Sequence, residues 1–213
     1  RLAGYEPVAR KAPGPRQPRW TRPRLLRESY PVEREAPTAA KTYLQMNWMV
    51  GDALDALDAA RLRVLSLLLL GHDAAPLHRA LIDSRLGADL VMSGAGEAGP
   101  EASFHVGLEG SEANRLDAFR GLTLDTLATL SRDVFAPGDV EAAFQQAAYD
   151  CVEILPMFPL HTIFRVINAW SAGRDPLLFL DMQEHFKRLR AEWKSCPTLF
   201  NELIRTRLLD NPH

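Results

Sequence analysis

The stretch KTYLQMNWMVGD, residues 41–52, alternates between two kinds of side chain and thereby predicts a β-strand. Successive side chains of a strand point to opposite faces of the sheet, so one face here is mainly apolar and the other is mixed. We therefore expect a sheet with one buried face and one face that carries polar groups. The first face takes Thr42, Leu44, Met46, Trp48 and Val50, and the second takes Tyr43, Gln45, Asn47 and Met49.

A β-hairpin is predicted further along the chain. DLVMSGAG (89–96) and ASFHVGLEG (102–110) flank the segment EAGPE (97–101), whose glycine and proline are typical of a turn. Ser103 and His105 fall on one face of the second run, so the hairpin repeats the division seen in residues 41–52. Its other face takes Ala102, Phe104, Val106 and Leu108.

Helices are predicted between these strands. After Gly51 and Asp52, leucine and valine recur at three- and four-residue steps, which indicates a largely buried helix that ends at Gly71. In PLHRALIDSRLG, residues 76–87, Pro76 suits the first turn of a second helix and Gly87 suits its C-terminal cap.

Several more helices are predicted after the hairpin. Ser111 suits an N-cap with Glu112 in the first turn, and Asp139 suits the N-cap of the next helix. The segment FLDMQEHFKRLRAEW, residues 179–193, has the pattern of an amphipathic helix. We expect Phe179, Met182, Phe186, Leu189 and Trp193 on its inner face, and breaks in the helical region at Pro156, Pro159, Gly173, Pro176 and Pro197.

The order of strand, two helices, hairpin and further helices predicts an α+β fold, with an antiparallel or mixed sheet and helices packed on one face. Residues 41–213 are expected to form this domain. Residues 1–40 are predicted to be a proline-rich, basic linker between domains, because seven of the 15 prolines fall within the first 37 residues. The first 35 residues hold nine Arg or Lys and four Asp or Glu, while the remainder is acidic.

The overall composition disfavours several classes of protein. The net charge of -2 and the pI of about 6.3 disfavour a nucleic-acid-binding protein. The longest unbroken apolar run, at residues 67–70, is far shorter than a membrane span. The two cysteines, Cys151 and Cys196, form no C-x-x-C pair, which fits a reducing, soluble compartment such as a bacterial cytoplasm or an organelle matrix. The arginines around Trp20 leave RNA binding by the linker as an alternative, weaker than packing of the linker on its own acidic domain.

No stretch supplies a catalytic or metal-binding constellation. LDMQEHF, residues 180–186, comes close to the zinc motif H-x-x-E-H but has Asp181 where the first histidine should stand. Asp181, Glu184 and His185 are neighbours on a helix, yet an amphipathic helix with solvated charges explains them better. SGAGEAG, residues 93–99, lacks the lysine of a phosphate loop, and no G-x-S-x-G elbow is present. We assign no catalytic residue and no metal ligand.

Several segments taken in order resemble the presequence-protease subfamily of pitrilysin/insulinase-type zinc metallopeptidases, the inverzincins. The similarity extends over nearly the whole chain, and the part of these enzymes that the chain resembles is their second, non-catalytic domain. It rests on GYEPV (4–8), QPRWTRPRLLRESYPV (17–32), KTYLQMNWMVGD (41–52), PLHRALIDSRLG (76–87), SFHVGLEG (103–110), WSAGRDP (170–176) and LIRTRLLDNPH (203–213).

The resemblance implies a domain like those of the mitochondrial processing peptidase, lacking its last strand. It also implies that the zinc ligands and the catalytic glutamate belong to a preceding domain, where a zinc-bound water attacks a peptide bond. The likeness of residues 181–185 to H-x-x-E-H is then accidental. The expected partners are the remaining domains of the same polypeptide and short unfolded peptides, with no nucleic acid and no membrane.

The second domain of such an enzyme would form part of the wall of a closed chamber in which peptides are degraded. Its polar sheet face is then the candidate substrate-facing surface, and it carries Gln45, Asn47, Ser103 and His105. The alternative is a catalytically inactive homologue that serves as an assembly or peptide-binding scaffold. The polypeptide before Arg1 distinguishes the two, because the enzyme needs H-x-x-E-H and a distal glutamate there.

Overall fold

The computed structural model describes residues 17–53, 55–98, 101–154, 156–171, 173 and 175–213. Helices and an antiparallel sheet occupy separate layers, so the predicted α+β class is confirmed. In chain order the elements are β1 (Thr42–Asp52), α1 (Ala56–Leu70), α2 (Pro76–Asp83), β2 (Asp89–Leu90), β3 (Gly94–Ala98), β4 (Glu101–Ser111), η2 (Ala113–Arg115), α3 (Leu116–Leu130), α4 (Pro137–Val152), α5 (Phe158–Ser171), α6 (Pro176–Leu180), α7 (Met182–Ser195), α8 (Leu199–Ile204) and η3 (Arg205–Leu209).

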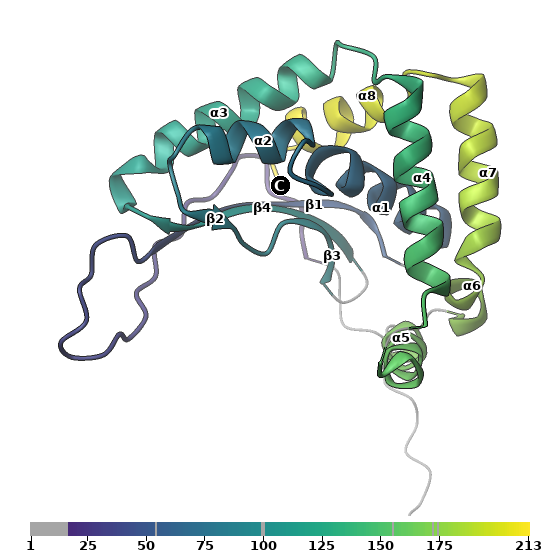
Figure 1. The fold of residues 1–213 in the computed structure, drawn as a ribbon, viewed down its shortest axis with the longest axis horizontal. Helices are drawn as coiled ribbons and strands as arrows, with labels where there is room; N and C mark the ends of the chain where they lie inside the picture. Colours follow the sequence, from purple (N-terminus) through teal and green to yellow (C-terminus); the bar gives the residue numbers. More distant parts are fainter. Residues whose placement is uncertain (1–16, 54, 99–100, 155, 172, 174) are drawn as a thin grey trace, which may run out of the picture.

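Strand β4 is the centre of the sheet. It pairs antiparallel with β1 along one edge and with the short strands β2 and β3 along the other. The two predicted runs 89–96 and 102–110 therefore do pair, although the turn residues 99 and 100 lie outside the described part of the chain. Figure 1 shows α1, α2 and α3 above this sheet, with α5 on its opposite side.

The apolar faces of β1 and β4 lie against the helices. The register places Trp48 opposite Phe104, and the centroids of these two rings are 6.5 Å apart. All side chains predicted on the inner face of β4 are buried, and so are Leu65 and Leu69 of α1. Burial of such side chains is the main stabilising term of a fold of this kind, at roughly 1.5–3 kcal/mol each.

Helix α1 begins directly after its N-cap residue, Asp55. The Asp55 side chain accepts hydrogen bonds from the backbone N–H groups of Leu57 (2.8 Å) and Asp58 (3.2 Å), which otherwise have no partner within the helix. The helix ends at Gly71, as predicted from the sequence. This helix is buried along most of its length and links the sheet to the outer helices.

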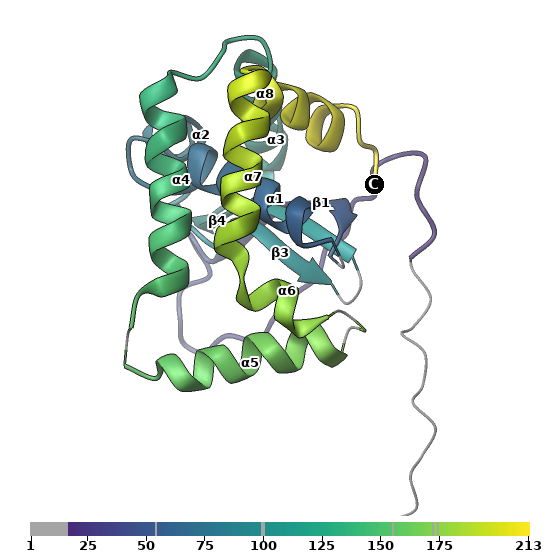
Figure 2. The same ribbon diagram turned by 90° about the vertical axis from the view of Figure 1, so that its right-hand side faces the viewer.

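The C-terminal helices lie beside the sheet (Figure 2), and their aromatic side chains belong to the same hydrophobic core. Phe144 of α4 lies 6.0 Å from the ring of Trp193 in α7 and 6.1 Å from that of Phe200 in α8. Asn201 is buried and donates to the carbonyl groups of Leu130 (2.6 Å) and Asp133 (2.7 Å). These bonds satisfy carbonyl groups at the end of α3 and fix α8 against it.

Two predicted N-caps are wrong. Ser111 is the last residue of β4, and its hydroxyl donates to the Leu86 carbonyl, so α3 begins only at Leu116 after a short 3-10 turn. Asp139 lies inside the first turn of α4, which begins at Pro137. The pairing of β4 with β1 extends this strand to Ser111, the position at which the local sequence predicts a helix cap.

The predicted end of α2 is also wrong. The helix ends at Asp83, and Arg85 rather than Gly87 adopts the left-handed conformation, with φ of 54°. Gly87 has a different task, because a Cβ there would come within 2.7 Å of the Glu109 carbonyl oxygen. The glycine permits close approach of this loop to β4.

The helix predicted over residues 179–193 is divided. Asp181 leaves the helical conformation, with φ of -97° and ψ of 54°, and separates α6 from α7. Phe186, Leu189 and Trp193 are buried as predicted, and Met182 is partly buried. The side chain of Phe179 lies outside the described residues. Pro159 does not break the chain as predicted but lies in the first turn of α5.

The two ends of the described chain meet at the outer edge of β1. His213 accepts a hydrogen bond from the Met49 N–H (3.0 Å), and the Asn211 amide donates to the Met49 carbonyl (2.9 Å). The backbone N–H of Trp20 donates to Nδ1 of His213 (3.0 Å). Residues 17–24 are therefore anchored to the domain, while the division into linker and domain at residue 40 stays a prediction.

Within the part of the chain that the structure describes, no helix combines the length and apolar character needed to cross a bilayer.

Replacing Phe104 by alanine tests the sheet–helix core. Phe104 is fully buried, and truncation of a buried phenylalanine typically lowers the free energy of unfolding by about 3–5 kcal/mol. We expect a loss of that size in urea unfolding followed by circular dichroism. The matched control is Tyr43→Ala, an aromatic truncation on the exposed face of β1, which should cost less than about 1 kcal/mol. Equal losses for the two variants would contradict the assignment of the buried face.

Candidate functional site

The face of the sheet turned away from helices α1–α3 carries a group of polar side chains near its centre. Asn47 of β1 stands directly opposite His105 of β4, and Met49 stands opposite Ser103. Gln45 lies on the same face, opposite Gly107. The four residues predicted to face a substrate thus share one face, and the structure brings three of them into contact.

Asn47, His105 and Ser103 form a hydrogen-bonded chain. Nδ1 of His105 lies 2.6 Å from the Asn47 side-chain oxygen, and Nε2 lies 2.8 Å from the Ser103 hydroxyl. Because the amide oxygen can only accept, Nδ1 carries the proton of the neutral ring and donates it. Nε2 is then the acceptor for the Ser103 hydroxyl. The two neighbours fix both the tautomer and the orientation of the imidazole.

The protonation of His105 follows from its surroundings. Burial of the ring lowers the pKa of His105 below its usual value of 6.5, since desolvation disfavours the charged imidazolium. The imidazole is therefore neutral around pH 7. Both ring nitrogens are engaged, so the neutral ring orients the side chain of Asn47, whose exposed amide can offer hydrogen-bonding groups to a ligand without adding charge to the face.

Gly96 of β3 makes room for this ring. A Cβ at position 96 would come within 2.9 Å of Nε2 of His105 and 3.1 Å of the Ser103 hydroxyl. Glycine in a strand often marks such a close approach. The local sequence of residues 93–99 fits a hairpin and gives no sign of this role.

The order serine, histidine, asparagine resembles the nucleophile, base and orienting group of a hydrolase. Ser103, however, is only 2% exposed and lies within a strand rather than at a turn before a helix. Its hydroxyl is buried beside the ring and is not presented to a substrate carbonyl. The chain of hydrogen bonds therefore orients His105 and does not activate Ser103 as a nucleophile.

A second polar group holds the N-terminal arm, residues 17–40, at the beginning of β4. Glu101 is buried and pairs with the Arg19 guanidinium at 2.9 Å, and it also accepts from the Gln17 N–H at 3.1 Å. The indole of Trp20 packs edge-on against the His213 ring at 4.7 Å. The sequence places Glu101 in the predicted turn 97–101 and gives no sign of this ion pair, because Arg19 lies 82 residues earlier in the chain.

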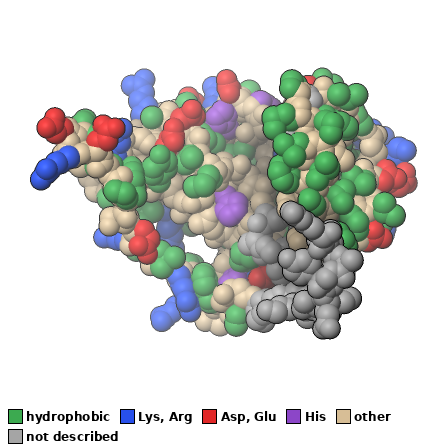
Figure 3. All heavy atoms as spheres, turned by 90° about the horizontal axis from the view of Figure 1, so that it is seen from below, with side chains coloured by type: hydrophobic (Ala, Val, Ile, Leu, Met, Phe, Trp, Pro, Cys, Tyr) green, Lys and Arg blue, Asp and Glu red, His purple; other side chains and the backbone are tan. Residues whose placement is uncertain are grey.

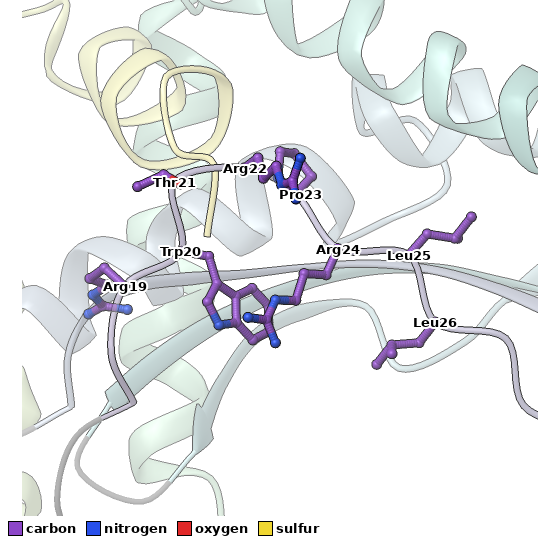
Figure 4. A pocket seen from close by; sticks show the side chains of 8 residues that line it. All are labelled: Arg19, Trp20, Thr21, Arg22, Pro23, Arg24, Leu25 and Leu26. Atoms are coloured by element: carbon purple, nitrogen blue, oxygen red, sulfur yellow. The ribbon is translucent and has the colours of Figure 1, made fainter.

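A shallow hollow follows the arm itself and is lined by consecutive residues, Arg19 to Leu26 (Figure 4). The Arg24 guanidinium lies 4.4 Å from the centre of the Trp20 ring, which is a cation–π contact. Thr21, Arg22 and Pro23 point away from that indole (Figure 4). A single curved segment of the arm and its own side chains form this hollow. The hollow is therefore not continuous with the polar face of the sheet.

The segment 181–185 does not form a metal site. Asp181 lies at the junction of α6 and α7, while Glu184 pairs with Lys187 on the surface of α7. Over the described ranges, no three His, Cys, Asp or Glu side chains converge as ion ligands. The side chains that the structure describes thus gather no set of zinc ligands, and no catalytic step through zinc is derived from them.

Two solved structures with this arrangement come from proteins described as peptidases. The chain superposes on the inactive peptidase domain of a protein described as a zinc protease from Bordetella parapertussis, with a TM-score of 0.60, 15% identity and coverage of 76% of this chain and 83% of that one. It also superposes on pitrilysin, with a TM-score of 0.53, 11% identity and coverage of 83% of this chain and 18% of that one. The fold is therefore that of the domains of pitrilysin- and insulinase-type peptidases.

Within this class of peptidases, sequence comparison finds similarity to presequence proteases. Presequence protease 1, chloroplastic/mitochondrial, of Arabidopsis thaliana is 30% identical over 200 residues, covering 91% of this chain and 18% of that protein. The mitochondrial presequence protease of Yarrowia lipolytica is 25% identical over 187 residues, covering 87% and 19%. No protein-family model matches the chain. The resemblance to presequence proteases predicted from the sequence is confirmed, and the chain spans about a fifth of the length of these relatives.

The titration of His105 tests the hydrogen-bonded chain. We expect the midpoint of its imidazole resonance, followed by NMR, below 6.5. Because the folded pKa is lower than the unfolded value, the unfolded chain binds the proton more readily. The contribution of His105 to stability is then complete above about pH 6.5 and falls as the pH drops toward the folded pKa.

His105→Gln removes the titrating group while keeping a polar side chain. Its urea midpoint should therefore fall less between about pH 7.5 and about pH 5.5 than that of the unaltered protein. A midpoint of the imidazole resonance above 6.5, or the same loss on acidification in both proteins, would show that the ring is not held neutral by burial.

Proposed function

We propose that this chain is a non-catalytic domain of a zinc metalloendopeptidase that degrades short unfolded peptides in a closed chamber. The observation that carries the proposal is the polar face of the sheet, where an oriented, neutral His105 stands between Asn47 and Ser103. This face belongs to a domain whose relatives are presequence proteases. The domain contributes surface to the chamber, and the peptide bond is cleaved by groups on other parts of the polypeptide.

The chemistry of the face suits an unfolded peptide. Unfolded peptides expose backbone N–H and C=O groups, which need hydrogen-bonding partners when they leave water. Asn47 is exposed, so its amide can be reached by a ligand, and the half-buried His105 holds this amide in place through Nδ1. Neutral donors and acceptors bind backbone groups with little preference for sequence, which is the property that degradation of varied peptides requires.

The proposed role of zinc concerns the parent enzyme. When bound there, the ion would supply a Lewis acid that polarises the peptide carbonyl and activates water. The residues of this chain would enclose the peptide and exclude water around it. The linker predicted over residues 1–40 would connect this domain to the preceding one, and the attachment of Arg19 to Glu101 and of Trp20 to His213 supports this role.

A catalytically inactive scaffold is the second candidate. The structural neighbour from Bordetella parapertussis is an inactive peptidase domain, so the fold also occurs without catalysis. The sequence of the parent polypeptide distinguishes the two roles. A preceding H-x-x-E-H helix with a distal glutamate supports the enzyme, and a preceding domain of this fold without that motif supports the scaffold.

Peptide binding tests the proposed face. We expect a fluorescently labelled, unfolded peptide to bind the purified chain, measured by anisotropy, and His105→Ala and Asn47→Ala each to weaken binding. Loss of one hydrogen-bonding partner costs about 0.5–1.5 kcal/mol, or roughly two- to tenfold in affinity. The control is Arg79→Ala on the surface of α2, which should leave affinity unchanged. Equal affinities for all three variants, each checked for folding, would exclude this face.

Metal analysis tests whether this chain is non-catalytic. We expect the purified 213-residue chain to retain no stoichiometric zinc after dialysis and to cleave no peptide, because the described residues gather no set of zinc ligands. Elemental analysis by mass spectrometry and a quenched-fluorescence peptide assay measure the two properties. One tightly held zinc per chain, or cleavage that a chelator abolishes, would contradict a non-catalytic role.

A further inference from the structure

Helix α5 turns its larger apolar side chains away from the domain. On the side nearest the domain it carries Thr162, Val166 and Ala169, of which only Ala169 is fully buried. The opposite side carries large apolar side chains along its length, whereas an amphipathic surface helix normally turns such a stripe toward the core. This α5 stripe consists of Leu160, Ile163, Phe164, Ile167 and Trp170, all of them exposed.

The contact between α5 and the rest of the domain is narrow. Ala169 packs against Ala56 at the start of α1, with Ala59 and Met182 beside them. Most of the remaining support of α5 comes from α6, the short helix that follows it. Figures 1 and 2 show α5 on the far side of the sheet from α2 and α3. The described part of the domain therefore does not itself cover the α5 stripe.

The exposed apolar surface extends into the segments directly before and after α5. Hydrophobic side chains gather on this side of the molecule in Figure 3, which shows it from below. At about half exposure, side chains of this size present on the order of 1,000 Å² in total. A monomer rarely exposes an apolar patch larger than a few hundred Å², so a surface of this size is expected to have a partner. The flanking residues are Val152, Ile154, Met157, Leu177, Leu178 and Leu180.

We propose that the apolar surface around α5 docks against another domain of the same polypeptide, which presents an apolar face of similar length. Such docking rests on the proposed function, in which this chain is one domain of a longer enzyme. The chain spans about a fifth of the length of its presequence-protease relatives, which supports that arrangement. Interfaces between domains of one chain bury about 600–1,500 Å², an area that the surface around α5 can supply.

Covalent linkage favours a domain of the same polypeptide over a separate molecule. A partner joined by a short connecting segment acts at an effective concentration in the millimolar range. A separate partner at micromolar concentration would need an affinity about a thousandfold higher to occupy the surface equally. Under the proposed function the connector is the linker predicted over residues 1–40. Its attachment to the domain through Arg19 and Trp20 leaves a shorter connecting segment, which keeps the effective concentration high.

The chemistry of the α5 stripe fits a permanent apolar interface. A peptide ligand needs partners for its backbone N–H and C=O groups, and the stripe offers mainly hydrocarbon, in contrast to the polar sheet face around His105. The sequence of α5 contains one residue of the Asp, Glu, Lys and Arg group, so covering the helix desolvates little charge. Its 14 residues extend about 21 Å, which sets the length of the apolar face required on the partner.

Hydrogen exchange in the full-length polypeptide tests whether α5 is covered. We expect the α5 amides to be protected there, and Phe164→Glu to speed their exchange by about tenfold or more, because it places a charge in the interface. The amides of β1 and β4 should keep their protection, which shows that the domain remains folded. On an uncovered helix the same substitution would not speed exchange, since glutamate favours the helical conformation more than phenylalanine does.

Matched variants separate docking from a general effect of the added charge. Phe164→Leu keeps an apolar side chain and should retain the protection of α5. Ile82→Glu places the same charge at an exposed apolar position of α2, on the other side of the sheet, and should leave α5 exchange unchanged. If Phe164→Glu also exposes β1 and β4, the milder Phe164→Ala replaces it and should speed α5 exchange by a smaller factor.

Dilution and added peptide identify the partner. Protection by a linked domain does not depend on protein concentration, so dilution by about a hundredfold should leave α5 exchange unchanged. Loss of protection on dilution would identify a second copy as the partner. Protection that develops only with added peptide would identify a peptide, and either result would overturn the docking of another domain.

Equal exchange of the α5 amides in the unaltered polypeptide and in Phe164→Glu would also overturn it. None of these measurements depends on cleavage. A polypeptide that cleaves no peptide but protects α5 in this way would contradict the proposed enzyme and leave the docking surface in place.

Discussion

The antiparallel pairing of β1 with β4 is the constraint on which the rest of the structure depends. Its register places Trp48 opposite Phe104 on one face and Asn47 opposite His105 on the other. A shift by one residue would exchange the two faces and would bury the polar group under the helices. The same set of backbone hydrogen bonds therefore forms the core and positions the candidate site.

The sequence predicts this arrangement well where one local pattern determines the structure. Strict alternation in residues 41–52 and 102–108 identified both strands and the face that would carry Asn47, Ser103 and His105. Capping residues were less reliable, because Ser111 and Asp139 have the right chemistry for a cap but lie where strand pairing or a preceding proline sets the boundary. Local preference is worth about 1 kcal/mol at such positions, and tertiary contacts exceed it.

The contacts that the sequence could not reveal join residues far apart in the chain. The distance between Asn47 and His105 depends on a register that contains two irregular steps in β1. The attachment of Trp20 to His213 spans nearly the whole described chain, and the role of Gly96 depends on β3 lying beside the His105 ring. None of these contacts produces a periodicity, so pattern analysis identifies the face but not the bonds within it.

The two exposed surfaces differ in chemistry. The sheet face offers neutral hydrogen-bonding groups on a rigid pair of strands, which suits a ligand that changes from one encounter to the next. Helix α5 offers a continuous apolar stripe with few polar groups, which suits a permanent partner, since the cores of lasting interfaces resemble divided protein cores. Under the proposed function the sheet face holds the peptide while the reacting groups lie on other parts of the polypeptide, so this domain would contribute to catalysis by position.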